Sequence, residues 1–468
     1  MKRLLCICSF VGFLLSLEAQ TPDYITNQYD YTVTKDISYG SDTAYDGKLT
    51  ELFLDLYKPV GDNNCKRPVI VLLHGGAWIG GDKAEGQIPA VAAQFAAKGW
   101  VVASINYRLG MHTAKGYTQY LLCPTDNPAL CAHVCDSSEI FRAIYRGMQD
   151  TRGAIRFLKL RAESDSTDVA NVHVAGESAG AFLAMYTAYL NRDEEKPSEC
   201  YELPDAPTSA PAFNFCHKAP KSLARPDLGS IHGSLHLGEA NDSVQGVACF
   251  YGAMHDLSIM DDNLMPTYIF HQASDVIVYY KRSRLLNRLS DCLSSICQPY
   301  YNMPLMSGGF LIKKHLSDLG ASAPPYKADI LENSTAFDCT INPPGHGIDN
   351  IPLRTKNIAE LFAPIVQTNG NNPADNCQTT HITTYSSTHL RIFPNPGTGE
   401  FILSTPDEME VTINMTDVLG RQTNIITNKI SNNAYKVIFM ENAHPGIYNC
   451  NIISPNNKWS TTYIYNNY

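Results

Sequence analysis

The 468-residue sequence predicts an α/β protein with a doubly wound, mostly parallel sheet, followed by a small all-β sandwich. Over the first three quarters of the chain, continuous apolar runs alternate with helix-like stretches, which is typical of buried parallel strands. Short alternating segments separated by turn signals occupy the last quarter. A third observation is Gly-Glu-Ser-Ala-Gly at 176–180, which lies between an apolar run and a helix-like stretch. It predicts a sharp strand-to-helix turn that exposes Ser178 at the sheet edge.

The N-terminal segment has the features of a secretory signal peptide. A short basic region at 1–3 precedes a nearly all-apolar run over 4–17. Cleavage is expected after Ala19, so that residues 1–19 are removed on export. The apolar run is too short for a membrane span, and no later run reaches the necessary length. The mature chain is therefore predicted to contain no transmembrane segment.

Residues 20–365 are predicted to form the catalytic domain. Its sheet is expected to contain strands at 36–39, 52–57, 69–73, 100–106, 171–175, 247–252 and 266–272. Helices are expected to cover the faces of this sheet at 84–98 and 139–161. Three further stretches look inserted and are predicted to form a rim or cap, at 110–137, 192–240 and 298–345.

A glycine-rich motif follows the strand expected at 69–73 and reads His-Gly-Gly-Ala-Trp over 74–78. Acyl transfer places negative charge on a carbonyl oxygen, and backbone N–H groups aimed at that oxygen stabilise it. The candidate donors are the N–H groups of Gly76, Ala77 and Ala179. His74 is expected to hold the loop by hydrogen bonding rather than to take part in chemistry. The supporting residues of the two motifs are His74, Gly75, Trp78, Gly176 and Gly180.

With these motifs in this order, residues 35–365 resemble the α/β-hydrolase esterase/lipase family that carries His-Gly-Gly-x-Trp. That family includes hormone-sensitive-lipase-like carboxylesterases, polysaccharide side-chain esterases and kynurenine formamidase-like enzymes. The segments 54–59 and 104–109 also match. Alanine at 77 replaces a third glycine, as in some members, and keeps the backbone donor. The resemblance implies an α/β-hydrolase fold and a triad in the chain order Ser, then Asp or Glu, then His.

The family places its acid in a loop after a strand and its histidine in a late loop. Asp275 follows a predicted strand, whereas Asp261 and Asp262 precede it. His346 lies in a Gly-flanked loop, whereas the other late candidate, His315, falls inside a helix-like stretch. The predicted catalytic residues are Ser178, Asp275 and His346.

These residues predict a secreted serine carboxylesterase or lipase-like hydrolase that cleaves esters through an acyl-enzyme on Ser178. No metal and no organic cofactor are expected, because metal-binding and phosphate-binding motifs are missing from the sequence. A net charge of −10 at pH 7 argues against nucleic acid as a partner. Two alternatives stay open: a serine peptidase or arylformamidase-like amidase on the same fold, and a non-catalytic surface binding protein. No residue pattern in the sequence indicates whether the ester is an acetyl ester, a feruloyl ester, a lipid or another small ester.

Cysteine usage is compatible with export. Cys6 and Cys8 fall in the predicted signal, which leaves 12 of the 14 cysteines for the mature chain. An even number is compatible with disulfides in an oxidising compartment, and buried free thiols are the alternative. Close pairs that suggest local bridges are Cys123 with Cys131 or Cys135, Cys200 with Cys216, and Cys292 with Cys297.

The composition changes near residue 366. Residues 366–387 are rich in Asn, Thr and Ser without apolar periodicity, which predicts a linker. Residues 388–468 contain short alternating strands at a spacing typical of an antiparallel sandwich.

Three blocks of this tail, at 393–401, 417–421 and 445–448, resemble the C-terminal sorting domain of the type IX secretion system. The resemblance implies that outer-membrane secretion machinery is a partner. It also implies export through the periplasm and outer membrane to a secreted or cell-surface location.

Overall fold

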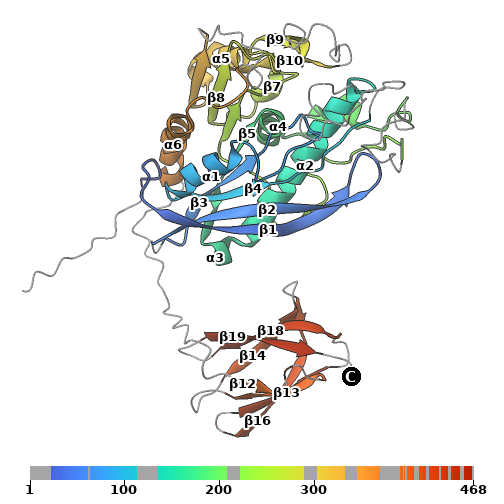
Figure 1. Cartoon of the computed structure of the whole chain (residues 1–468), viewed down its shortest axis with the longest axis vertical. Helices are drawn as coiled ribbons and strands as arrows, with labels where there is room; N and C mark the ends of the chain where they lie inside the picture. The colour runs from blue at the N-terminus through green and yellow to red at the C-terminus, as the bar shows by residue number, and fades with distance from the viewer. Residues whose placement is uncertain are drawn as a thin grey trace, which may run out of the picture. The chain divides into compact units, whose positions relative to one another are not determined.

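In the computed structural model of the chain, the described residues are 23–61, 64–112, 134–207, 222–288, 303–332, 345–368, 391–393, 395, 398–404, 411–417, 421–431, 434–440, 444–453 and 458–465. The chain divides into two units, Met1–Asp375 and Asn376–Tyr468 (Figure 1).

The first unit contains an eight-stranded, mostly parallel sheet. Its strands in spatial order are β1 (Asp30–Thr43), β2 (Leu49–Val60), β4 (Val101–Ile105), β3 (Arg67–Leu73), β5 (Thr167–Glu177), β6 (Val247–Phe250), β8 (Thr267–Gln272) and β11 (Tyr326–Leu331). β1, β2 and β4 pair antiparallel, and every later neighbour is parallel. The carboxyl ends of β3, β5, β8 and β11 therefore lie at one edge of the sheet, where loops are free to carry function.

Helices cover both faces of this sheet (Figure 1). One face packs on α1 (Ile88–Ala96) and α6 (Ile351–Thr368), and the other on α2 (Ser138–Leu160), α4 (Ala179–Tyr189) and α5 (Gly309–Asp318); a short helix, α3 (Ala162–Asp165), follows α2. Successive side chains of a strand point to opposite faces, so Ile70 belongs to the apolar cluster of Phe95, whereas Val71 belongs to the cluster of Phe182. This alternation inside a fully buried strand explains why β3 is a continuous apolar run.

The predicted strands and both predicted helices are present, with shifted ends. The helix expected over 84–98 begins only at Ile88, with a proline in its first turn, and ends at Ala96. The segment 298–345, predicted to be an insertion, contains α5 and the edge strand β11, so that expectation is wrong for its central part. A small sheet of β7 (Ala253–Met254), β10 (Leu305–Gly308) and β9 (Arg282–Arg284) lies beside it. The predicted insertions at 110–137 and 192–240 lie partly outside the described residues.

The second unit is an antiparallel sandwich, as the sequence predicts. One sheet has the order β12 (Arg391–Phe393), β13 (Glu400–Ser404), β17 (Ala434–Phe439) and β16 (Ile425–Ser431). The other has the order β15 (Gln422–Thr423), β14 (Thr412–Asp417), β18 (Gly446–Ile453) and β19 (Lys458–Tyr465). Phe401 and Val437 from the first sheet and Met415 and Cys450 from the second are buried in one apolar cluster.

The predicted cysteine bridges find no support among the described residues. Cys200 is a buried free thiol, so the expected bridge from Cys200 to Cys216 is wrong. Burial raises the pKa of the Cys200 and Cys249 thiols to about 12, as expected for structural cysteines. Cys65, in contrast, is disulfide-bonded. The other predicted pairs include cysteines that lie outside the described residues, namely Cys123, Cys131, Cys292 and Cys297.

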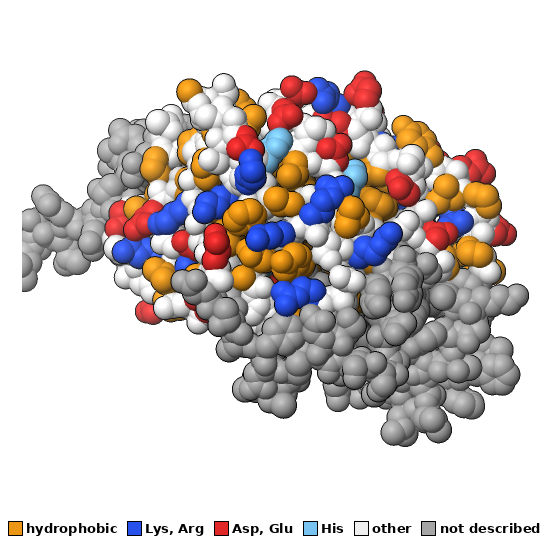
Figure 2. Space-filling view, turned by 90° about the horizontal axis from the view of Figure 1, so that it is seen from above, with side chains coloured by type: hydrophobic (Ala, Val, Ile, Leu, Met, Phe, Trp, Pro, Cys, Tyr) orange, Lys and Arg blue, Asp and Glu red, His pale blue; other side chains and the backbone are white. Residues whose placement is uncertain are grey.

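On the face that carries α5 and β9, Lys and Arg side chains lie among hydrophobic ones (Figure 2). The Lys281 ammonium lies over the rings of Tyr280 and Phe310, at 5.1 Å and 5.2 Å from their centres. Basic side chains thus cover part of the apolar surface. Among the helices of the described residues, none combines the length and apolar composition that a membrane crossing requires.

Candidate active site

Ser178 lies at the turn between β5 and α4. Its backbone has φ 51° and ψ −123°, a conformation that costs energy for a residue with a side chain. The Ser178 N–H donates to the carbonyl of Phe250 at 3.0 Å, which ties the turn to β6. A Cβ atom on Gly180 would come within 2.3 Å of the Leu73 carbonyl oxygen, so only glycine fits there. Strand, turn and helix are therefore arranged as the motif predicts.

His346 lies in the loop that precedes α6 and contacts two residues far away in the sequence. Its Nε2 atom is 2.8 Å from Ser178 Oγ, and its Nδ1 atom is 2.9 Å from Asp275 Oδ2. A carboxylate can only accept, so Nδ1 carries a proton and Nε2 presents its lone pair to the serine hydroxyl. This arrangement allows the Ser178 proton to move to His346 as Oγ attacks a carbonyl carbon.

Asp275 is fully buried in the loop after β8. Its Oδ1 atom accepts hydrogen bonds from the N–H groups of Ile277 at 2.9 Å and Val278 at 3.0 Å. Burial by itself raises the pKa of this carboxyl, but the charges and hydrogen bonds of His346 and His271 outweigh burial and hold the pKa below its ordinary value. Asp275 is therefore ionised at neutral pH and can orient His346.

His271, which the sequence analysis did not single out, supports Asp275 from inside β8. Its Nε2 atom lies 2.7 Å from the Val278 carbonyl oxygen and 3.3 Å from Asp275 Oδ2. Its Nδ1 atom accepts from the Gly309 N–H at 3.1 Å, which leaves the proton on Nε2. The only sequence signal was a polar residue in an apolar strand, since such a residue needs buried partners.

The rival acid and base candidates pair away from Ser178. His315 Nε2 lies 2.7 Å from Asp261 Oδ1, and Asp262 forms an ion pair with Arg192. Neither residue of the Asp261–His315 pair is buried. The structure therefore brings Asp275 and His346 to Ser178, and does not bring their rivals there.

The glycine-rich loop after β3 lies against Ser178. Ala77 lines the same cavity as Ser178 and Ala179. In the described part of the chain, the N–H groups of Gly76, Ala77 and Ala179 donate to no protein acceptor. Unpaired N–H groups beside a nucleophilic hydroxyl can bind a carbonyl oxygen that becomes negative.

His74 holds this loop from behind, as expected. Its Nδ1 atom is 2.7 Å from the Gly75 carbonyl oxygen, and its ring stacks on Tyr107 at 4.4 Å between ring centres. The Tyr107 hydroxyl donates to the His74 carbonyl at 2.9 Å. Burial lowers the pKa of His74, so its ring is neutral and structural.

Two glutamines that the sequence analysis missed fix the loop of His346. The Gln87 side chain donates to the Ile348 carbonyl at 2.9 Å and accepts from the Ile348 N–H at 2.6 Å. The Gln272 side chain donates to the Gly347 carbonyl at 2.9 Å. Residues 87 and 348 are 261 positions apart, so no local pattern could have linked them.

The cavity at Ser178 is small and apolar. Its volume is about 30 Å³. The apolar side chains that line it belong to Ala77, Trp78, Met111, Ile140, Ala179, Phe182, Ile277, Val278, Leu285, Leu286 and Met303. Such a space next to the Ser178 hydroxyl suits a short hydrocarbon group and excludes charged ones.

Glu177, the residue before Ser178, is a second buried carboxyl near His346. Its Oε2 atom accepts from the Tyr251 hydroxyl at 2.7 Å, and the Tyr251 ring lies 4.6 Å from the His346 ring. Burial raises the pKa of Glu177, and the Tyr251 hydrogen bond and His346 only partly oppose this. Glu177 therefore binds its proton more tightly in the folded chain than in the unfolded chain.

Replacing Glu177 by glutamine should reveal this cost of burial as a pH effect. Because the folded pKa is raised, stability falls as pH rises above the ordinary value of 4.5 and levels off above the folded pKa. Glutamine keeps an acceptor for Tyr251 without charge. We expect the difference in melting temperature between Glu177→Gln and wild type to increase, in favour of the variant, by roughly a few degrees from pH 4 to pH 8.

Glu360→Gln is the control for this titration. Lys327 lowers the pKa of Glu360, so loss of that charge should not stabilise the protein at pH 8. A difference between Glu177→Gln and wild type that does not change with pH would contradict the expected effect.

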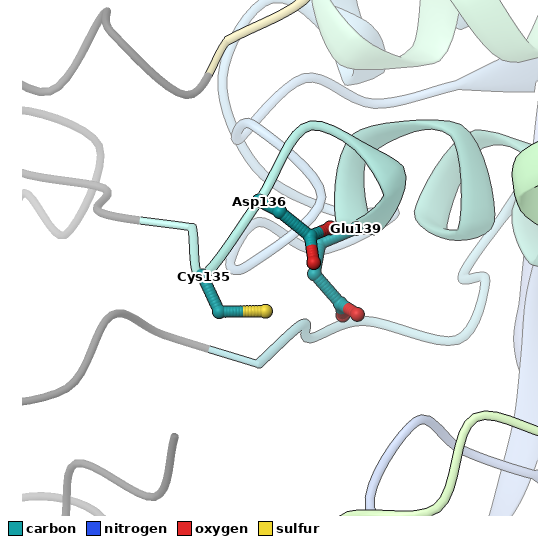
Figure 3. Close-up of side chains that lie close together, drawn as sticks. All are labelled: Cys135, Asp136 and Glu139. Atoms are coloured by element: carbon teal, nitrogen blue, oxygen red, sulfur yellow. The ribbon is translucent and has the colours of Figure 1, made fainter. Parts of the chain in front are cut away.

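One cluster of metal-ligand types lies at the start of α2, formed by Cys135, Asp136 and Glu139 (Figure 3). Arg225 NH1 lies 2.7 Å from Asp136 Oδ2 and 3.6 Å from Glu139 Oε1. Burial and the two carboxylates raise the pKa of the Cys135 thiol to about 12. The Arg225 guanidinium thus lies where a metal cation would neutralise the two carboxylates. The Cys135 sulfur is a protonated thiol rather than a thiolate ligand.

Comparison with known proteins identifies both units. The BD-FAE family model matches residues 54–117 and 140–219, which include the glycine-rich loop and the Ser178 turn. The chain carries an esterase-like BD-FAE domain. The model of the secretion system C-terminal sorting domain matches residues 391–466. The BD-FAE domain has the α/β-hydrolase fold, and the sandwich is a type IX sorting domain.

Esterase LipC of Mycobacterium tuberculosis is 25% identical to the chain over 280 residues. The aligned part covers 60% of this chain and 60% of that relative. Thermogutta terrifontis esterase 2 phosphoramylated by tabun matches with 14% identity and a TM-score of 0.39, over 70% of this chain and 95% of that one. A truncated carbohydrate esterase from gut microbiota matches with 14% identity and a TM-score of 0.39, over 72% of this chain and 97% of that one.

The sorting domain determines where the BD-FAE domain is delivered. A domain of this type marks a chain for export to a secreted or cell-surface location.

Proposed function

We propose that this protein is an exported serine esterase in which Ser178 is the nucleophile, His346 the base and Asp275 the residue that orients it. The observation that most supports this proposal is the pair of hydrogen bonds, 2.8 Å and 2.9 Å, that links the three side chains. A serine hydroxyl needs such a base to attack an ester at neutral pH.

The reaction has two steps. In the first, His346 takes the proton of Ser178 as Oγ attacks the ester carbonyl, and the N–H groups of Gly76, Ala77 and Ala179 stabilise the oxyanion. His346 then gives the proton to the departing alcohol, which leaves an acyl group on Ser178. In the second, His346 takes a proton from water as the water oxygen attacks the acyl carbon. The bond from the acyl carbon to Ser178 Oγ then breaks, which releases the carboxylic acid, and His346 returns the proton to Oγ.

Parallel assays on matched ester and amide substrates test the reaction class. An esterase should hydrolyse 4-nitrophenyl acetate and the acetyl esters of a glycan, and leave a peptide or formyl-anilide of equal size nearly untouched. Faster turnover of the amide would replace this proposal by the amidase alternative.

The cavity at Ser178 predicts a preference for short acyl groups. Its small volume, about 30 Å³, and its apolar lining leave room for only a short hydrocarbon group, such as the methyl of an acetyl group. Forcing extra methylene groups into a packed site costs about 1–3 kcal/mol, so kcat/KM should fall about tenfold or more from acetyl to butyryl. A feruloyl ester should be poorer still.

Leu285→Ala enlarges this cavity and should move the optimum to longer chains. Leu285 is buried and lines the cavity, so its truncation adds room for roughly two or three carbon atoms. Leu316→Ala is the matched control, because Leu316 is equally apolar and buried but lies outside the cavity. Both variants should lose stability, and only Leu285→Ala should change the acyl-length profile measured with 4-nitrophenyl esters. An unchanged profile in Leu285→Ala would mean that acyl groups bind elsewhere.

A further inference from the structure

A second and much larger cavity lies between the end of β1, helix α2 and the segment 224–237. Its volume is about 500 Å³, within the range of roughly 300–1,000 Å³ that is usual for small-molecule sites. Four arginines line it: Arg108, Arg142, Arg146 and Arg225. Ala224 and Leu237, which are exposed, also line it, so the cavity reaches the surface.

Two of these arginines have acidic partners. Arg108 NH2 lies 2.7 Å from Asp150 Oδ1, and Arg108 NH1 lies 3.0 Å from Asp42 Oδ2. Arg225 pairs with Asp136 at 2.7 Å. Both guanidinium groups therefore have their charge compensated within the protein.

The other two have no carboxylate at ion-pair distance within the described part of the chain. Arg142 donates to the carbonyls of Glu199, at 3.0 Å, and of Tyr201, at 2.9 Å, and also to that of Pro226. Among the described residues, Arg146 donates one hydrogen bond, to the Gly110 carbonyl at 3.0 Å. Only 3% of Arg146 is exposed, so a charged group with five N–H donors is buried with one protein partner.

Three buried polar atoms on the cavity wall lack a hydrogen-bond partner. They are Arg146 Nε, Glu139 Oε1 and His112 Nε2, on residues that are 3%, 1% and 3% exposed. Burying such a group without a partner costs about 1–3 kcal/mol, and more for a charge. The wall therefore carries a donor on Arg146 that makes no hydrogen bond. It also carries an acceptor on Glu139, the residue seen at the start of α2 in Figure 3, whose Oε1 makes no hydrogen bond and only a 3.6 Å ion-pair contact with Arg225.

We propose that this cavity binds a small hydroxy carboxylate of the size of one sugar acid. The carboxylate of the ligand pairs with the guanidinium groups of Arg142 and Arg146, which lack acidic partners. Its hydroxyl groups donate to Glu139 Oε1 and bond with His112 Nε2, since a hydroxyl can serve as donor and acceptor. A purely anionic ligand would leave Glu139 Oε1 without a hydrogen bond, and a neutral sugar would leave the charges of Arg142 and Arg146 uncompensated.

The site is distinct from the proposed active site but shares a wall with it. Met111 and Ile140 line the cavity at Ser178, whereas their chain neighbours His112 and Glu139 line the larger cavity. The inference does not depend on the esterase proposal, because binding is measured without turnover.

Calorimetric titration of the full chain with three probes tests the chemistry of the ligand. D-glucuronate is expected to bind. D-glucose, which lacks the carboxylate, and inorganic phosphate, which lacks the sugar hydroxyls, should each bind at least about tenfold more weakly. Equal binding of glucose would show that charge is not recognised, and equal binding of phosphate would show that hydroxyls are not. Either result, or no binding of glucuronate, would overturn the assignment.

Arg146→Met tests the site itself. An apolar side chain of similar length removes an underpaired buried charge, so the melting temperature should be unchanged or higher while glucuronate binding falls at least about tenfold. An arginine with a purely structural role would behave in the opposite way, with lower stability. Arg161→Met, on a residue that follows α2 and pairs with Asp165 at 2.8 Å, is the control and should keep glucuronate binding.

Leu237→Trp keeps the test decisive if Arg146→Met does not fold. Leu237 is 58% exposed at the rim of the cavity, so tryptophan should narrow the entrance without disturbing the core. Glucuronate binding should again fall at least about tenfold. Wild-type binding in this variant would overturn the proposed site.

Discussion

Replacing Ser178 by alanine is expected to reduce kcat on a short acyl ester by roughly 10⁴–10⁶-fold. The change removes the atom that would form the acyl-enzyme and leaves the unpaired N–H groups of Gly76 and Ala77 in place, so only a residual rate should remain. Alanine retains the Cβ atom of Ser178, whose side chain, within the described part of the chain, forms one hydrogen bond, to His346. The melting temperature should therefore stay close to wild type.

A fluorophosphonate probe separates this loss of catalysis from a loss of folding. Wild type should be labelled at Ser178, and Ser178→Ala should not. Ser164→Ala, at an exposed serine after α2, is the matched control and should be labelled and active like wild type. A wild-type chain that stays unlabelled and inactive would favour the non-catalytic binding protein instead.

Asp275→Asn is expected to reduce kcat by about 10³–10⁴-fold while the fold is retained. Asp275 Oδ1 accepts two N–H groups, from Ile277 and Val278, so the amide oxygen of asparagine must take that position. The NH2 group then faces His346 Nδ1 and requires it to accept. The imidazole proton moves to Nε2, where the ring can no longer take the proton of Ser178.

Asp261→Asn is the matched control for this prediction. It alters another Asp–His pair, with a 2.7 Å contact to His315, that lies away from Ser178. Activity on 4-nitrophenyl acetate should be unchanged in this variant. Near-wild-type activity of Asp275→Asn, or a comparable loss in Asp261→Asn, would contradict the proposed role of Asp275.

Much of the fold was predictable because its signals are local. The apolar run that forms β3 indicated a strand buried on both faces, and the motif at 176–180 indicated the turn at Ser178. Where prediction failed, the signal was not local. β11 was assigned to an insertion because its half-buried residues show neither an apolar run nor clean alternation at the sheet edge.

The sequence by itself determined the order of the candidate motifs along the chain: a glycine-rich loop, a serine turn, an acid after a strand and a histidine in a late loop. Steric limits at Gly180 and the periodicity of buried strands account for the serine turn and the strands, whereas the positions expected for the acid and the histidine follow from the resemblance to the α/β-hydrolase family. Only the tertiary structure decided that His346 meets Ser178 across 168 positions, that Gln87 holds its loop, and that Arg146 faces a polar cavity. Hydrogen bonds between distant side chains depend on how whole elements pack, and packing leaves no periodic trace in the chain.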